Sequence, residues 1–81
     1  MREFALGNII QHFKRETVDQ NSMQYLYEFI GVATHSETRD RVVVYRALYG
    51  DKELFVRPYE MFMEEVDHDK YPEIRQKYRF E

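Results

Sequence analysis

The sequence has no cysteine and only three glycines among its 81 residues. Without cysteine the chain has no thiolate to serve as a nucleophile or a metal ligand. A secreted domain of this size usually carries disulfides, so we expect a cytoplasmic location. Scattered glycines cannot form a phosphate-binding loop, which is rich in glycine. The chain also lacks an apolar run long enough for a signal peptide or a membrane span, so we expect no contact with a membrane.

The chain does contain many aromatic and charged residues. It has six phenylalanines and seven tyrosines, and 43% of its residues are apolar, which is enough for a packed core. The length predicts one domain over residues 1–81, which would bury only about 60% of its unfolded surface. The net charge is −3. This charge favours solubility and disfavours nonspecific binding to nucleic acid or to an anionic membrane.

The strongest strand signal lies between residues 42 and 58, where two short apolar strands flank the turn Gly50-Asp51-Lys52. Strand-forming residues upstream predict further antiparallel strands, and a proline followed by acidic residues predicts a short helix downstream. The polar segment Arg15–Met23 lacks periodicity and is interpreted as a mobile loop. The predicted elements are strands at Ile9–Lys14, Gln24–Thr34, Val42–Tyr49, Glu53–Arg57 and Lys77–Glu81, and a helix at Pro58–Val66.

Turn lengths set the register that we expect for this sheet. Gly31 should face Tyr45, whose ring would cover the bare glycine backbone, and Tyr45 should lie beside Arg57 in the next hairpin. Both faces of the sheet are then apolar, which favours a mainly β fold: a curled antiparallel sheet or small barrel of about five strands with one short helix. The aliphatic face would comprise Ile30, Val32, Val42, Val44, Leu48, Leu54 and Val56, and the aromatic face Tyr27, Phe29, Tyr45, Tyr49 and Phe55.

Several uncommon sequence motifs occur in order along nearly the whole chain. They are His12-Phe13-Lys14, GVATHSETRDRVVVYRALYGD, VRPYEMFMEEV and the final YRFE. In these motifs the chain resembles the bacterial family called domain of unknown function 1653. The resemblance implies a single SH3-like β-barrel domain and no particular activity, because the family has none established. The sequence departs from the family pattern after Lys14, where a longer segment precedes the second strand.

No arrangement of reactive side chains predicts an enzyme. Ser22 and Ser36 lack the glycine elbow of a nucleophilic serine, and the acidic pairs near residues 64–69 are interpreted as solvated charge. The three histidines lack the close spacing of a zinc site. We therefore expect no catalytic residue, no metal and no cofactor.

Two arginines in the predicted sheet carry more information. Arg46 lies in mid-strand on the aliphatic face, where a buried guanidinium needs a partner, and Glu28 is placed diagonally to pair with it. Arg57 should stack on Tyr45. Arg57 can act as a binding group for a carboxylate or phosphate, or as a structural tie between the sheet and the following segments, and we favour the tie.

The aromatic face is the main functional lead. If the helix and tail cover it, its rings form a second core, and if part stays open, it forms a groove. Our hypothesis is a non-catalytic module that binds a protein or peptide partner through Tyr45, Tyr49 and Arg57, with His35 at the rim. His35 also begins a turn whose polar side chains suit local backbone hydrogen bonds. The alternative is a module for single-stranded nucleic acid, which the lack of a basic stripe disfavours; an enzyme acting on a polar substrate is least favoured. The sequence indicates no oligomeric state.

Overall fold

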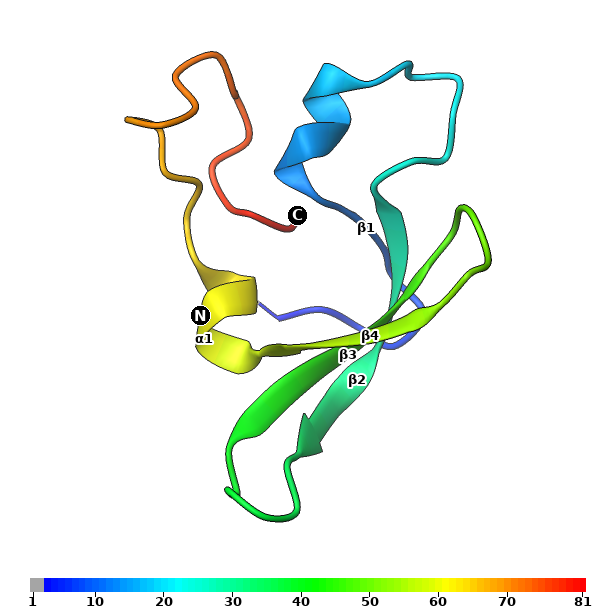
Figure 1. The fold of residues 1–81 in the computed structure, drawn as a ribbon, viewed down its shortest axis with the longest axis vertical. Coiled ribbons are helices and arrows are strands. Elements are labelled where there is room, and N and C mark those ends of the chain that lie inside the picture. The colour runs from blue at the N-terminus through cyan, green and yellow to red at the C-terminus, as the bar shows by residue number, and fades with distance from the viewer. Residues whose placement is uncertain (1–2) are drawn as a thin grey trace.

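The computed structural model describes residues 3–81 and shows four antiparallel strands in one open sheet (Figure 1). Strands adjacent in sequence are adjacent in the sheet, in the order β1-β2-β3-β4. The mainly β fold with an antiparallel sheet and one short helix is confirmed, with four strands instead of the expected number of about five. The elements are β1 (Ile9–Gln11), a 3-10 helix (Phe13–Thr17), β2 (Leu26–Thr34), β3 (Arg41–Ala47), β4 (Leu54–Pro58) and α1 (Tyr59–Met63).

The register of both hairpins differs from the one expected. Tyr45 faces Phe29 on one side and Phe55 on the other, rather than Gly31 and Arg57. The turns take up more residues than expected, and a β-bulge after Phe29 adds one residue to β2. At Tyr45 each shift amounts to two residues, and side chains alternate with a period of two, so Tyr45 stays on the aromatic face.

The aromatic face of the sheet is the core of the domain. Helix α1 and the C-terminal tail lie against it and contribute Phe62 and Phe80, whose rings stack at 4.2 Å between centroids. The reading of this face as a core is therefore correct. The core comprises Ile10, Tyr27, Phe29, Val43, Tyr45, Ala47, Phe62 and Phe80, and a smaller cluster comprises Phe13, Val66 and Ile74.

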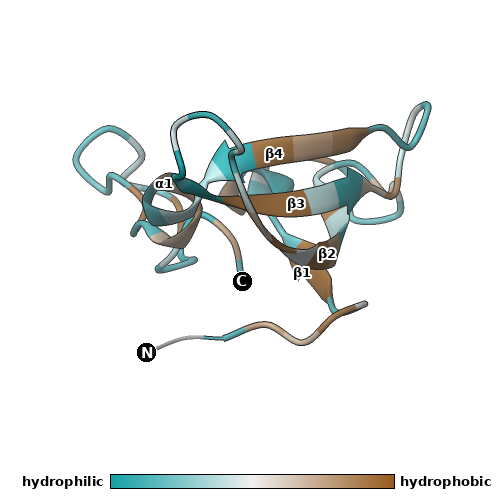
Figure 2. Ribbon diagram, turned by 90° about the horizontal axis from the view of Figure 1, so that it is seen from below, coloured by the Kyte–Doolittle hydropathy of each residue, from teal (hydrophilic) through white to brown (hydrophobic). Residues whose placement is uncertain are grey.

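The aliphatic face points away from this core. Figure 2 shows hydrophobic colouring in the middle of β3 and along much of β4. Ile9, Leu54 and Val56 on this side are exposed. Val32 was expected on this face, but it lies on the core side opposite Val43, because the bulge after Phe29 shifts the alternation of β2 by one residue. The sheet is thus apolar on both faces, as the sequence predicts, but residues 3–81 cover only one of them.

The expected ion pair between Arg46 and Glu28 is not formed. The two residues lie directly opposite each other on β3 and β2, and both are half-buried. Within residues 3–81 the one ion pair joins Arg79 to Glu64, at 3.3 Å. The prediction assumed a buried guanidinium, whereas the aliphatic face is open to water, which can solvate the charge.

The segment after β1 is ordered by a buried arginine. The strand expected at Ile9–Lys14 ends at Gln11, where the chain turns into the 3-10 helix. Arg15 on this helix is buried, and its guanidinium donates hydrogen bonds of 2.8–3.1 Å to three backbone carbonyls within residues 20–24. The segment Arg15–Met23, expected to be a mobile loop, is therefore tied to the body of the domain.

Helix α1 is shorter than the helix expected at Pro58–Val66. It ends at Met63, and Glu64 is already extended, with φ −62° and ψ 154°. The chain extends here because it pairs with the tail: the Val66 N–H donates to the Lys77 carbonyl at 2.8 Å. Within residues 3–81 no helix has the length and apolar character to cross a membrane.

The tail does not form the closing strand expected at Lys77–Glu81. It makes two isolated β-bridges instead, one joining Phe80 to His12 and one joining Tyr78 to Glu65. These bridges carry the tail across the end of the sheet between β1 and the residues after α1. The tail thereby becomes one wall of a cavity at this end of the sheet.

Candidate functional site

Two of the four predicted binding residues are tyrosines that the fold largely encloses. Tyr45 is 5% exposed and packs against Phe62 and Phe80. The prediction that it contacts a partner is therefore wrong, because the ring is enclosed. The reason is the cover supplied by α1 and the tail. Tyr49 is half-buried, and its hydroxyl shares a 2.9 Å hydrogen bond with that of Tyr27. Burial, followed by this hydrogen bond, raises the pKa of Tyr27 above its ordinary value.

His35 lies on the exposed turn between β2 and β3, apart from the other three predicted residues. Its Nδ1 accepts hydrogen bonds from the backbone N–H groups of Glu37 and Thr38, both at 3.2 Å. The imidazole therefore organises the turn through local backbone hydrogen bonds, as expected for the polar side chains of this segment. His35 lines a cavity with Arg41 and Tyr59, and Arg57 is not among the residues around that cavity.

Arg57 takes the position expected of a structural tie. It lies near the end of β4 on the core side of the sheet, half-buried, opposite Val43. Its Nε donates a 3.3 Å hydrogen bond to the Tyr45 hydroxyl, and its guanidinium carbon lies 5.4 Å from the centre of the Phe80 ring. These contacts tie the sheet to the tail. Among residues 3–81 no carboxylate lies within ion-pair distance of this guanidinium.

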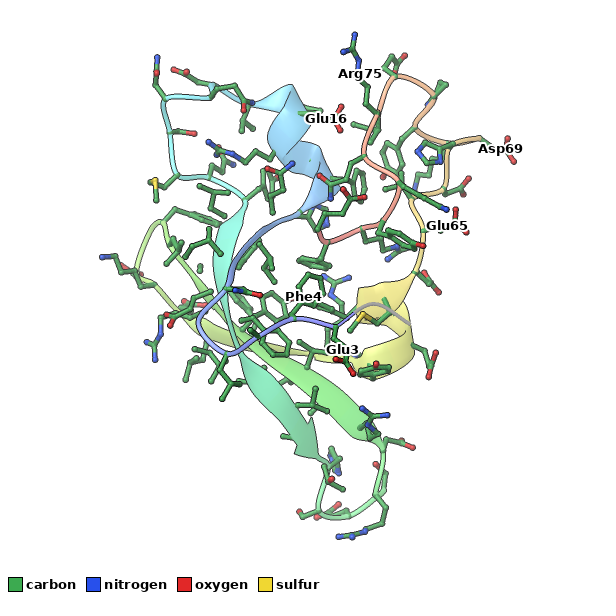
Figure 3. The ribbon with its side chains drawn as sticks, turned by 180° about the vertical axis from the view of Figure 1, so that it is seen from behind. Glu3, Phe4, Glu16, Glu65, Asp69 and Arg75 are labelled. Atoms are coloured by element: carbon green, nitrogen blue, oxygen red, sulfur yellow. The ribbon has the colours of Figure 1, made fainter. Side chains whose placement is uncertain are left out.

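Arg57 also lines a cavity of about 360 Å³ that brings distant segments together. The walls come from the start of the 3-10 helix, the end of β4, the turn near residues 67–71 and the tail. Figure 3 shows the 3-10 helix, marked by Glu16, beside the tail that carries Arg75, and the Arg75 N–H donates to Glu16 Oε1 at 2.9 Å. The lining residues are His12, Phe13, Lys14, Arg57, Asp67, Lys70, Tyr71 and Arg79, and we call this cavity the basic pocket.

The charges of the basic pocket are unbalanced. Four of its lining residues are lysine or arginine and one is acidic. The acidic residue, Asp67, already accepts hydrogen bonds from the backbone N–H groups of Asp69 and Lys70 through Oδ1. Arg79 is paired with Glu64. The pocket therefore concentrates positive charge on a chain whose net charge is −3.

His12 lies in this positive field as a neutral imidazole. Burial, and then the charges of Arg57, Lys14 and Arg79, lower its pKa from 6.5 to about 4. Its Nδ1 accepts a 3.1 Å hydrogen bond from the Lys14 backbone N–H, so the ring proton sits on Nε2. The ring is held in place by stacking on Phe13 at 4.4 Å. His12 thus adds a neutral N–H donor to the cationic donors around it.

Among the residues that line the basic pocket, Arg57 is the one that the sequence predicts as a binding group. No binding role is predicted from the sequence for Lys14, Lys70 or Arg79. His12 is considered only as one of three histidines whose spacing does not suit zinc. These residues come from segments far apart in sequence, so no local pattern joins them. The available signal was the pair of aromatic–basic motifs His12-Phe13-Lys14 and Tyr78-Arg79-Phe80, whose aromatic residues anchor neighbouring cations in the fold.

The pocket is suited to anions rather than metals. Within residues 3–81 no group of three or more potential metal-ligating side chains comes together. Guanidinium, ammonium and imidazole N–H groups donate hydrogen bonds to phosphate, sulfate or carboxylate oxygens, and charge assistance strengthens each bond.

Comparison with known proteins places the chain in a family without a described activity. The family model described as protein of unknown function (DUF1653) matches residues 8–81. The chain therefore belongs to this family, as its motifs indicated. The searches of curated proteins and of solved structures returned no match. The likeness to SH3-like barrels stays a prediction.

Proposed function

We propose that this domain is a non-catalytic binding module that holds an anionic group of its partner in the basic pocket. The observation that carries the proposal is Arg57, a half-buried guanidinium without an acidic partner in residues 3–81 at the wall of an open cavity. Withdrawing a charge from water is costly unless an opposite charge compensates it. A bound anion would supply that compensation.

The partner is a protein or peptide carrying a phosphate or carboxylate group. One pocket of this size receives one anionic group, and the net charge of −3 repels a long polyanion. A phosphate monoester carries close to two negative charges near neutral pH, which matches the excess of cations better than one carboxylate does. Binding through donors alone requires no nucleophile, so the proposal leaves the domain non-catalytic.

Single-stranded nucleic acid is the second candidate, and one observation favours it. The pocket places the Tyr71 ring 5.0 Å from that of Phe13, next to its cations. Aromatic rings beside basic groups are the usual means of binding a base and its phosphate. The number of phosphates contacted separates the two candidates, because it sets how steeply affinity falls with salt.

The test is a titration of the full chain with sulfate and with acetate, in which binding is monitored through amide chemical shifts. We expect sulfate to move the signals of the pocket residues and to bind more tightly than acetate. Arg57→Gln should weaken sulfate binding at least tenfold, which corresponds to about 1.4 kcal/mol. The matched control is Arg75→Gln, the same change at an exposed residue outside the pocket. Equal affinity for sulfate in wild type and Arg57→Gln would contradict the proposal.

The class of partner is decided by a second measurement. Phosphorylated and unphosphorylated peptide libraries and a mixed oligonucleotide pool are compared at two salt concentrations. A phosphopeptide held by one group should show a shallow salt dependence. Tight oligonucleotide binding with a steep salt dependence, lost in Arg57→Gln, would replace the peptide by nucleic acid as the partner.

A further inference from the structure

The aliphatic side of the sheet forms a continuous surface across all four strands. We call it the outer face. One row of directly paired residues crosses the sheet as Ile9, Glu28, Arg46 and Leu54. The neighbouring rows are Gly31–Val44–Val56, with Ile30 at the bulge, and Ala33–Val42–Pro58. Leu6 extends the surface, since its Cδ2 lies 3.6 Å from the position of a Cβ on Gly31.

The fold leaves this surface uncovered within residues 3–81. Ile9, Leu54 and Val56 are 59%, 55% and 65% exposed. Helix α1 and the tail lie on the other side, where Phe62 and Phe80 join the core. A monomeric protein rarely exposes a contiguous apolar patch of more than a few hundred Å², and larger patches mark contact surfaces. The exposed aliphatic rows therefore indicate a contact surface that a partner covers.

The charges on the outer face indicate what that partner is. Glu28 and Arg46 are adjacent at its centre, and they form no ion pair with each other within residues 3–81. The face thus presents one negative and one positive group and no net charge. A strongly charged partner has nothing to match on such a surface. A second copy turned by a twofold axis matches it, because Glu28 of each copy then meets Arg46 of the other.

We propose that the outer face is the interface of a symmetric homodimer in which two sheets pack face to face. The four strands have three, nine, seven and five residues. At about 3.3 Å per residue and about 4.8 Å between strands, they give a face of roughly 400 Å² before side-chain relief is counted. Specific interfaces bury about 800 Å² from each partner, with smaller ones at the low end. The face therefore suits a weak dimer, with the two sheets about 10 Å apart.

This inference is independent of the anion site. Arg57 and the basic pocket lie on the core side of the sheet, and the outer face lies on the opposite side. A dimer through the outer face would leave both pockets open. It would hold two anionic groups at once, so a partner with two such groups would bind more tightly than one with a single group.

The first test is the mass of the full chain by analytical ultracentrifugation over micromolar to submillimolar concentrations. We expect a concentration-dependent shift from 10.0 kDa toward twice that mass. Val56→Lys should weaken dimerisation at least tenfold, and Leu54→Lys should do the same. Met61→Lys is the control, since Met61 is 43% exposed on α1, away from the outer face. Circular dichroism verifies that each variant folds. A wild-type chain that stays monomeric throughout overturns the proposal.

The second test uses the two charges. Glu28→Arg gives both copies two positive groups, and Arg46→Glu gives both two negative groups, so each variant alone should be mostly monomeric. Mixed in equal amounts, the two variants should form a heterodimer, because every contact again joins opposite charges. Restored dimerisation in the mixture supports the twofold arrangement. Two monomeric variants that stay monomeric when mixed overturn it, as do single variants that dimerise like wild type.

Discussion

Gln76 connects the tail to β1 through its buried side-chain amide. Its Nε2 donates to the backbone carbonyls of Gln11 at 3.1 Å, Tyr78 at 2.8 Å and Arg79 at 3.2 Å. Its Oε1 accepts a 2.8 Å hydrogen bond from Gln11 Nε2. The substitution Gln76→Glu keeps the shape of the side chain and removes both amide hydrogens. It therefore isolates the contribution of these donors to holding the tail.

The expected loss of stability in Gln76→Glu follows from the backbone carbonyls that are left without a donor. Each buried carbonyl that loses its donor costs about 1–3 kcal/mol, and a carboxylate facing carbonyl oxygens adds repulsion. Two amide hydrogens are shared among the three carbonyls. We therefore expect Gln76→Glu to lower the free energy of unfolding by about 3 kcal/mol at pH 7. A chain of this length is stable by roughly 4–12 kcal/mol, so the variant should still fold. The melting temperature should fall by about 15 °C.

Thermal melts at pH 7 and pH 4.5 provide the measurement. Burial beside carbonyl oxygens should raise the pKa of the new carboxyl group, and its protonated form regains one donor. The difference from wild type should therefore be smaller at pH 4.5 than at pH 7. Gln24→Glu is the matched control, because Gln24 is exposed. A loss below about 1 kcal/mol at pH 7, or one equal to the control, would refute the assigned role of these hydrogen bonds.

Three further predictions concern other buried polar groups. Arg15→Met should lower stability by about 2 kcal/mol and speed amide exchange in residues 18–24, because three carbonyls lose a donor but can recruit water; unchanged exchange rates would argue against the anchor. Tyr49→Phe should cost about 1 kcal/mol in a denaturant titration, because the Tyr27 hydroxyl loses its partner, and an unchanged midpoint would contradict this. The pKa of His12 is about 4 in the folded chain, against 6.5 unfolded. Stability should therefore fall by about 1 kcal/mol, after allowance for solvent screening, as pH falls between these values. His12→Asn keeps a side-chain acceptor and does not titrate, so this part of the pH dependence should disappear in urea titrations.

Apart from Val32, which the bulge moves to the core side, the sequence predicts the two faces of the sheet well, and it predicts the register poorly. Side chains alternate with a period of two, and both register shifts at Tyr45 amount to two residues, so Tyr45, Phe29 and Phe55 stay together on the aromatic face. Register depends on how many residues each turn takes up and on the bulge after Phe29. Neither has a strong signal here, because the turn residues suit several turn types.

The candidate site could be predicted only in part, because it is assembled by long-range contacts. Arg57 stood out as an arginine at the end of an apolar strand. Its neighbours His12 and Arg79 can be placed beside it only when the path of the tail is known. That path depends on the packing of Phe80 against Phe62. The same contact explains why Tyr45 is enclosed. The net charge of −3 gave no indication of the basic pocket, because an acidic chain can still gather positive charge at one place on its surface.

The bridge between Phe80 and His12 has a consequence for the order of folding. Closing a loop of roughly 70 residues costs about 4 kcal/mol of chain entropy, against about 2 kcal/mol for the short loop between β2 and β3. The β2–β3 hairpin should therefore form in the folding transition state, while the tail docks after the barrier. Changes at Gln76 or Phe80 should then speed unfolding and leave the folding rate nearly unchanged. The segment that completes the basic pocket would thus be the first to leave when the domain opens, so the occupancy of the pocket and the lifetime of the native state are linked.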